Sequence, residues 1–276
     1  NDLDILITGG NDLGNNVNNL YINDGTGGFT LSVQPFIAVG GFSDADFSDI
    51  DNDGDMDVLI SGAVGPLAES YLYVNDGNGN FTEVTGSTIA GVINAAIGFA
   101  DIDNDGDDDL LITGAGAGSV LYENDGLGNF VEAISQPISI VTSGDIEFAD
   151  VDGDGNIDVM VTGSYAGQNA DLYSNDCYGN YTNVLGMPFL GVSNSAISFA
   201  DVDGDNDLDL LITGAVGGTS LYINESTPQP ASPFITTWQT TTANESITIP
   251  TTGVGYNYDI DWGDGNTTTG AIGDTG

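Results

Sequence analysis

Residues 101–109 read DIDNDGDDD, and the apolar run LLITG (residues 110–114) follows at once. This order recurs along the chain. The aspartate-rich nonapeptides are Asp49–Asp57 (DIDNDGDMD), Asp101–Asp109 (DIDNDGDDD), Asp150–Asp158 (DVDGDGNID) and Asp201–Asp209 (DVDGDNDLD). Each has aspartate at positions one, three, five and nine, so four carboxylates converge on a short loop. They repel one another unless a cation lies among them.

The residue types indicate which cation. Oxygen ligands in a flexible loop favour Ca²⁺ over Mg²⁺ or a softer metal. The spacing suggests side-chain ligands at positions one, three and five, a main-chain carbonyl at position seven and a final carboxylate at position nine. Position six must turn sharply, which fits Gly54, Gly106, Gly155 and Asn206. Solvated turns without metal are the alternative, but four copies in one register favour a cation site.

Two better-known calcium loops begin in the same way, and neither fits. An EF-hand needs a bidentate Glu at position twelve and flanking helices. Position twelve here is Ile60, Ile112, Val161 or Ile212, each inside an apolar run typical of a buried strand. The nonapeptide arrays of parallel β-helices need a much shorter period. The sequence therefore predicts a calcium loop that leads directly into a β-strand.

The charge composition excludes several functions. The 276 residues include 42 acidic side chains and no Lys, Arg or His, so bound cations must supply the counter-charge. Nothing in the chain can replace the counterions of a nucleic acid, and an anionic membrane surface would repel it. The apolar fraction of 40% still provides for a substantial core.

The same composition argues against catalysis. A Ser, Thr or Cys nucleophile would lack its usual general base. Two carboxylates could still hydrolyse a glycoside, but the clustered acids are better explained as calcium ligands. We therefore expect no enzymatic activity. The single cysteine, Cys177, excludes an intrachain disulfide. Cys177 occupies a turn position where the other repeats have Gly. It is interpreted as a tolerated turn substitution; the alternative is an intermolecular disulfide or another role of the thiol.

The motif belongs to a longer repeat. The anchor residues that follow the apolar runs, Thr8, Ser61, Thr113, Thr162 and Thr213, are 53, 52, 49 and 51 residues apart. The first nine residues, NDLDILITG, match NDLDLLITG at residues 206–214, which places Asn1, Asp2 and Asp4 at positions six, seven and nine of a fifth, partial loop. We expect either upstream sequence or another chain to complete that loop. The period is typical of a repeat architecture.

Each repeat carries four short strand signals. In the third repeat these are residues 109–115, 119–123, 129–134 and 145–151. An Asn-Asp-Gly turn joins the second and third signals and ends on an aromatic residue that we expect between neighbouring sheets. These turns are Asn23–Phe29, Asn75–Phe81, Asn124–Phe130 and the variant Asn175–Tyr181. Four strands and a period near fifty predict a β-propeller with one blade per repeat.

These residues also carry a family resemblance. Phe99–Gly116 (FADIDNDGDDDLLITGAG) followed by Val120–Phe130 (VLYENDGLGNF) resembles the FG-GAP and VCBS repeats of integrin-like β-propellers, over about residues 1–225. The resemblance implies an all-β fold of four-stranded blades with Ca²⁺ at the blade edge. Such propellers usually have seven blades, whereas about five are visible here.

The ligands that the resemblance implies follow by position. They are Asp49, Asp51, Asp53, Asp55 (main chain) and Asp57; Asp101, Asp103, Asp105, Asp107 (main chain) and Asp109; Asp150, Asp152, Asp154, Asn156 (main chain) and Asp158; and Asp201, Asp203, Asp205, Asp207 (main chain) and Asp209. Asp2 and Asp4 would serve the partial loop. The expected cofactor is thus Ca²⁺, in four complete loops and one partial loop.

A second domain is expected after the repeats. Residues 226–233 form a Pro/Ser/Thr-rich linker. Within residues 234–276, the stretch YNYDIDWGDGNTTTG (residues 256–270) resembles the PKD-like, immunoglobulin-type module of bacterial surface proteins, including those with BspA-type repeats. This match stops before the strands that would complete a β-sandwich. Asp261 and Asp264 are expected to be turn residues.

Together these features predict a non-catalytic, calcium-stabilised adhesion or ligand-binding module of a secreted or surface protein. Its expected partner is an extracellular protein or glycan, or copies of itself, with no nucleic acid and no membrane insertion. One alternative is a structural subunit of an extracellular fibre assembled through blade edges and calcium loops. Another is an accessory domain of a polysaccharide-degrading enzyme. Propeller specificity lies in variable loops, so the sequence does not name the ligand.

Overall fold

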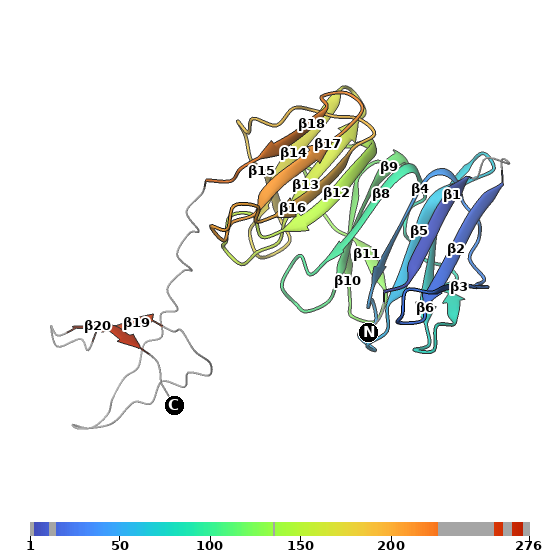
Figure 1. The fold of residues 1–276 in the computed structure, drawn as a ribbon, viewed down its shortest axis with the longest axis horizontal. Helices are drawn as coiled ribbons and strands as arrows, with labels where there is room; N and C mark the ends of the chain where they lie inside the picture. The colour runs from blue at the N-terminus through green and yellow to red at the C-terminus, as the bar shows by residue number, and fades with distance from the viewer. Residues whose placement is uncertain (1–2, 11–14, 135, 226–256, 262–266, 273–276) are drawn as a thin grey trace, which may run out of the picture. The chain divides into compact units, whose positions relative to one another are not determined.

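The computed structural model describes residues 3–10, 15–134, 136–225, 257–261 and 267–272 (Figure 1). Every element in these ranges is a β-strand, which confirms the predicted all-β fold. No helical segment in the described ranges has the length and apolarity of a membrane span. The chain divides into two compact units, Asn1–Ser232 and Pro233–Gly276.

The first unit contains five antiparallel sheets in chain order, which we call blades 1 to 5 (Figure 1). Blades 2 to 4 have four strands and blades 1 and 5 have three. Their strands are β1 (Ile5–Gly10), β2 (Asn16–Asn23) and β3 (Phe29–Ser32); β4 (Gly40–Ser48), β5 (Asp57–Val64), β6 (Leu67–Asn75) and β7 (Phe81–Glu83); β8 (Val92–Ala100), β9 (Asp109–Gly116), β10 (Val120–Asn124) and β11 (Phe130–Glu132); β12 (Thr142–Ala149), β13 (Asp158–Ser164), β14 (Gln168–Asn175) and β15 (Tyr181–Asn183); and β16 (Ala196–Ala200), β17 (Asp209–Thr213) and β18 (Thr219–Tyr222). This arrangement agrees with the predicted four-stranded, propeller-like blades.

Blades 2 to 5 each begin with the strand that precedes the aspartate-rich loop, whereas β1 of blade 1 follows the partial loop. In blade 2, β4 pairs with β5 across the loop Asp49–Asp57, with Ser48 opposite Asp57. The fourth strand signal of the third repeat is β12, which pairs with β13 and so opens blade 4. The last strand of each sequence repeat is therefore the first strand of the next sheet. The reason is that the strand before an aspartate-rich loop pairs with the strand after it.

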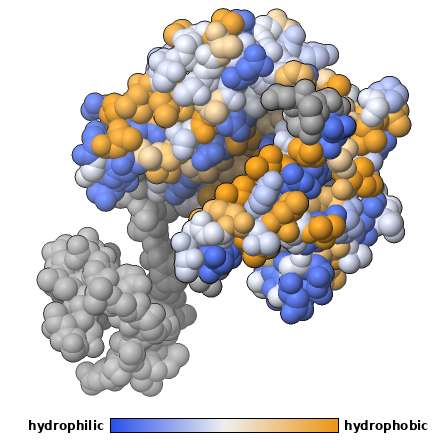
Figure 2. Space-filling view, turned by 45° about the vertical axis from the view of Figure 1, so that its right-hand side comes forward, coloured by the Kyte–Doolittle hydropathy of each residue, from blue (hydrophilic) through white to orange (hydrophobic). Residues whose placement is uncertain are grey.

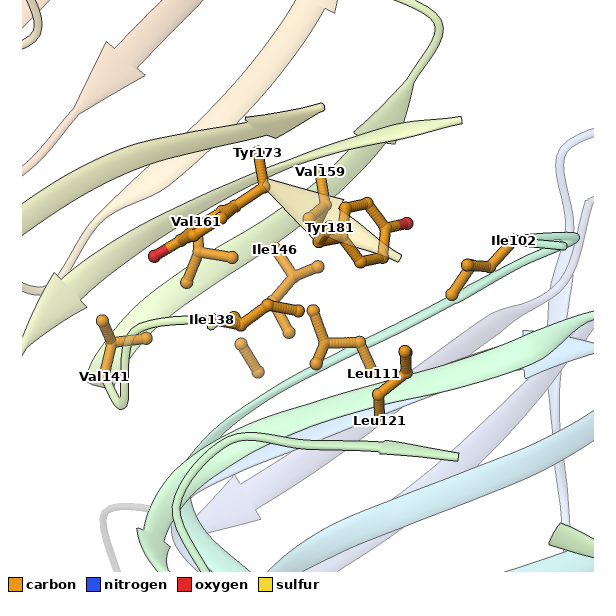
Figure 3. Close-up of a cluster of buried hydrophobic side chains, with 11 residues drawn as sticks. Ile102, Leu111, Leu121, Ile138, Val141, Ile146, Val159, Val161, Tyr173 and Tyr181 are labelled. Carbon is orange, nitrogen blue, oxygen red and sulfur yellow. The ribbon is translucent and has the colours of Figure 1, made fainter. Parts of the chain in front are cut away.

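The second strand of a blade contributes to the cores on both of its faces. Successive residues of a strand point to opposite faces. In blade 2, Leu59 packs with residues of blade 3, whereas Val58 and Ile60 pack with residues of blade 1. In the same way Leu111 of β9 faces Val159 and Val161 of β13 (Figure 3). This dual burial explains why the runs after the loops are apolar at consecutive positions.

The aromatic residue after each Asn-Asp-Gly turn was expected between sheets. Phe81, Phe130 and Tyr181 fulfil this, because each is buried in the core shared with the preceding blade. Phe29 of blade 1 does not, since 46% of its surface is exposed. Within the described residues no sheet lies on that side of blade 1, which accounts for the difference.

A repeated tyrosine holds the connection between blades. Its hydroxyl accepts a hydrogen bond from a main-chain N–H in the segment that enters its blade, at 2.9 or 3.0 Å. The pairs are Tyr73 with Ile37, Tyr122 with Ala90, Tyr173 with Ser139 and Tyr222 with Leu190. Because the rings are buried or half-buried, each bond satisfies a polar group that water reaches poorly.

The second unit is described only in part. Strands β19 (Asn257–Asp261) and β20 (Thr267–Ile272) form an antiparallel pair. The predicted linker at residues 226–233 and most of the predicted PKD-like segment, Asp264 included, lie outside the described residues. The PKD-like module therefore stays a prediction, and Asp261 lies at the end of β19.

One turn position generates a stability prediction. Cys177 has φ +66°, where the equivalent Gly25, Gly77 and Gly126 have +74°, +72° and +69°. We expect Cys177→Gly to raise the free energy of unfolding by about 1 kcal/mol, because relief of left-handed strain exceeds the added freedom of the unfolded chain. The matched variant Gly126→Ala should destabilise, since its methyl group would meet the Asp107 carboxylate. Denaturant unfolding in calcium measures both, and a Cys177→Gly chain no more stable than the parent would contradict the prediction.

Candidate metal centres

The four complete aspartate loops occupy equivalent places. They are loop 2 (Asp49–Asp57), loop 3 (Asp101–Asp109), loop 4 (Asp150–Asp158) and loop 5 (Asp201–Asp209), numbered after their blades. Each joins the first strand of its blade to the second. Equivalent connections place the loops at the same edge of successive blades.

Carboxylate oxygens from three residues converge in every loop. Within each group one oxygen per residue lies within 4.8 Å of the others; the groups are Asp49, Asp51 and Asp53; Asp101, Asp103 and Asp105; Asp150, Asp152 and Asp158; and Asp201, Asp203 and Asp209. Two oxygens that bind one Ca²⁺ at about 2.3–2.6 Å lie at most about 5 Å apart. The groups therefore fit a calcium ion. Positions one and three converge in all four loops, joined by position five in loops 2 and 3 and by position nine in loops 4 and 5.

The loop backbone is wound around the position-one carboxylate. In loop 2, Asp49 Oδ1 accepts the Asp53 N–H and Asp49 Oδ2 accepts the Gly54 N–H, both at 3.0 Å. The predicted left-handed turn at position six is confirmed, with φ between +73° and +95° at Gly54, Gly106, Gly155 and Asn206. Position four is left-handed as well, which sequence reasoning missed. Its residues are Asn52, Asn104, Gly153 and Gly204, types that tolerate this conformation.

Position nine has a structural role beyond the predicted one. The Asp57 carboxylate is buried, and it accepts the Asn75 N–H at 2.7 Å through Oδ1 and the Ile50 N–H at 3.2 Å through Oδ2. The same pair of bonds recurs at Asp109, Asp158 and Asp209. This carboxylate therefore ties the start of each loop to the turn asparagine of the same blade, or to Asn224 at the equivalent position of blade 5. In the partial loop, Asp4 Oδ1 accepts the Asn23 N–H at 2.8 Å, while Asp2 lies outside the described residues.

Burial makes the position-nine carboxylates of loops 2, 3 and 4 hard to ionise in the absence of metal. It raises the pKa of Asp57 and of Asp158 to about 6 and that of Asp109 to about 7, although the two N–H donors at each carboxylate act in the opposite direction. Neighbouring loop carboxylates add to the rise in pKa. A bound cation would favour the ionised forms and reverse this effect.

Position seven was expected to offer its main-chain carbonyl. The structure places the N–H of Asp55, Asp107, Asn156 and Asp207 on the carboxylate of position five, at 2.9–3.2 Å. The carbonyl role stays a prediction. So do the ligand roles of the predicted side chains outside the convergent groups, which are Asp57, Asp109, Asp154 and Asp205. Two position-seven side chains instead contact the preceding loop: Asn52 donates to Asp107 at 2.5 Å, and Asn104 to Asn156 at 3.5 Å.

A further contact links each loop to the next blade. The side-chain amide of the turn asparagine donates to the main-chain carbonyl at position two of the preceding loop. The bonds are Asn124 to Ile50 (2.9 Å), Asn175 to Ile102 (2.7 Å) and Asn224 to Val151 (3.1 Å). The recurrent Asn of the turn motif was the only feature of the sequence that indicated this bond. The motif did not show that the acceptor is the position-two carbonyl of the preceding loop.

Comparison with known proteins agrees with this geometry. Two matches to the FG-GAP-like repeat cover residues 62–112 and 101–161. No curated protein matches the chain. Among solved structures, one similar chain is an Agrocybe aegerita lectin, described as specifically recognising non-reducing terminal N-acetylglucosamine. It is 18% identical with a TM-score of 0.38, and the alignment covers 76% of this chain and 70% of the lectin. The family matches show FG-GAP-like repeats within residues 62–161, and together with the repeated sheets they support a β-propeller-like repeat protein.

The convergent carboxylates predict strong dependence on calcium. Each site that binds Ca²⁺ only in the folded state stabilises it by about 2.7 kcal/mol when free calcium is a hundredfold above Kd, or about 11 kcal/mol for four sites. Chelation should then lower Tm by about 20 °C or more. Calorimetry with calcium and with EDTA measures the shift. An EDTA sample that melts within a degree or two of the calcium form would refute the assignment.

The raised pKa values predict an inverted pH dependence without metal. Asp57, Asp109 and Asp158 keep protons in the folded chain up to about pH 6–7, whereas the unfolded chain loses them near pH 4. The unfolded state thus binds fewer protons in this window, and stability falls as the pH rises from about 4 to 7. Saturating calcium should reverse the slope, because binding requires ionised carboxylates. Thermal melts across this range, in metal-free and calcium buffers, measure it; a metal-free chain that gains stability towards pH 7 would contradict it.

Proposed function

We propose that this chain is a non-catalytic, calcium-stabilised, β-propeller-like module of a secreted or surface protein, which binds an extracellular protein or glycan. The observation that carries the proposal is the recurrence of one convergent carboxylate group per loop in a chain without any basic side chain. Such loops hold a scaffold in shape, and the ligand would be recognised by side chains that differ between blades.

Calcium chemistry supports an extracellular setting. Calcium sites of extracellular modules work at about 10⁻⁴–10⁻³ M free calcium, and their oxygen ligands are of the type found in these loops. FG-GAP-like repeats are typical of extracellular proteins. The formal net charge of −42 at pH 7 destabilises the compact state through self-repulsion, and bound calcium would offset part of that charge.

The residue inventory supports a binding role. His and Lys, the usual general bases for a Ser, Thr or Cys nucleophile, do not occur in the sequence. The convergent aspartates are engaged with loop N–H groups and with one another. A scaffold with rigid blades and exposed connections fits recognition better than chemistry.

A direct test presents the immobilised chain to arrays of glycans and of extracellular proteins in millimolar calcium. Binding should be saturable and should vanish in EDTA. A variant with Asp101→Asn and Asp103→Asn, which removes two carboxylates of loop 3, should need more calcium for the same binding. A chain that is folded in calcium and binds none of the array members above background would count against the proposed ligand-binding function.

Exposed sheet faces favour a second candidate, a subunit of an extracellular fibre. Ile5 and Ile7 of blade 1 are exposed, whereas the equivalent Val58 and Ile60 of blade 2 are fully buried against the preceding blade. At the other end Leu211 and Leu221 are exposed on blade 5. Figure 2 shows apolar side chains on the face turned toward the viewer, on the side where β1–β3 lie.

The two exposed faces correspond to the two sides of the junction between blades. Leu59 and Leu72 of blade 2 are the equivalents of Leu211 and Leu221, and they pack against Leu110 and Ile112 of blade 3. Blade 5 of one copy could pack in the same way on blade 1 of another. Such a head-to-tail contact is heterologous and produces rings or open filaments.

Sedimentation of the chain over a range of concentrations tests the fibre candidate. Leu221→Glu should abolish association in calcium, because it places a charge in the contact face. Leu127→Glu, at an exposed turn of blade 3, is the matched control and should associate like the parent. A parent chain that stays monomeric at all concentrations, or equal association of both variants, would reject this candidate.

A further inference from the structure

The side chain of Asp207, at position seven of loop 5, lies in an unusual environment. Only 7% of the residue is exposed, and neither carboxylate oxygen receives a hydrogen bond from an N–H group or a hydroxyl. Burial and the neighbouring Asp205 carboxylate of the same loop raise the pKa of Asp207 to about 6. It lines a cavity of about 40 Å³ together with Asn206 and Leu208 of its own loop and Asp150, Val151, Asp152 and Gly153 of loop 4. The carboxylate therefore lies at the junction between two loops.

The two preceding junctions show what is missing here. Position four of one loop meets position seven of the next: Asn52 donates to Asp107 at the first junction, and Asn104 to Asn156 at the second. At the third junction position four is Gly153, which has no side chain. Asp207 thus has no amide donor where its counterparts have one.

A buried, ionised carboxylate without a partner is strongly unfavourable. The chain cannot supply a basic side chain to pair with it, because it contains no Lys, Arg or His. What does lie across the cavity is the convergent group of loop 4, since Asp150 and Asp152 line the cavity and belong to that group with Asp158. More carboxylates only increase the need for a cation.

We propose that the Asp207 carboxylate is a ligand of the divalent cation in loop 4, supplied by blade 5 across the blade junction. The cation site of loop 4 is then built from two blades. The missing side chain at Gly153 leaves room for the carboxylate, and a cavity of this size admits an ion or a water molecule beside it. Ca²⁺ takes six to eight oxygens, so it accepts this ligand in addition to those of its own loop.

The inference rests on the proposed binding of calcium by loop 4 and deepens it. In this arrangement the main chain of Asp207 belongs to loop 5, while its side chain binds the cation of loop 4. Calcium in loop 4 then holds blade 5 against blade 4. At the junctions between loops 2 and 3 and between loops 3 and 4, the amides of Asn52 and Asn104 make the contact across the junction. No shared ion is required there.

The experiment is a calcium titration followed by the backbone amide signals of Gly155 in loop 4 and Gly106 in loop 3. We expect Asp207→Asn to raise the calcium midpoint at Gly155 by about tenfold or more, because a charged ligand is lost, and to leave that at Gly106 within about twofold. The control Glu132→Gln, which removes an exposed carboxylate at the end of β11 outside the loops, should leave both midpoints within about twofold.

A second variant approaches the site from the other side. Gly153→Asn restores the amide found at the other two junctions, in a left-handed position that Asn tolerates. By engaging Asp207 it should also raise the calcium midpoint at Gly155. An unchanged Gly155 midpoint in Asp207→Asn, with a normal response at Gly106, would overturn this inference alone. Failure of both amides to respond in the parent chain would overturn the calcium assignment itself, and this inference with it.

Discussion

Repulsion between carboxylates without any basic residue to offset it is the constraint on which this structure depends. In most proteins a Lys or Arg beside an Asp relieves local charge, and the loss of one ion pair is tolerated. Here relief can come only from solvent, protons, N–H donors or metal ions. N–H donors supply part of this relief, because the carboxylates at positions one, five and nine each accept hydrogen bonds from the main chain. What remains is the charge that a cation must balance.

The loops are also joints of the fold. Position nine fixes the start of a loop to the turn of its own blade, and the turn asparagine of the next blade reaches back to position two. Ile50 and Ile102 at position two are fully buried by this arrangement, whereas Val202 of loop 5 is 53% exposed. Each loop therefore belongs to a blade and to the junction that follows it. Metal binding and blade packing are linked through the same short segment.

Sequence reasoning reached what is local. The period, the strand after each loop, the left-handed position six and the convergence of positions one and three all follow from spacing within a nonapeptide or from the two-residue period of a strand. It did not reach contacts between repeats, such as Asn52 with Asp107 or Asn124 with Ile50, because these depend on how sheets about fifty residues apart are set against each other. Phe29 was misjudged for the same reason, since its exposure depends on a neighbouring sheet and not on its own turn.

The double-faced second strand sets how this protein tolerates change. Leu111 of β9 serves the core toward blade 4, while Leu110 and Ile112 serve the core toward blade 2. Deletion of one residue in β9 would exchange these side chains between faces and damage both cores at once. Duplication of an entire repeat would instead leave every junction with its normal partners. The chain behaves as a one-dimensional array whose natural unit of insertion and loss is the blade, and its length can vary in steps of about fifty residues with little change to any single contact.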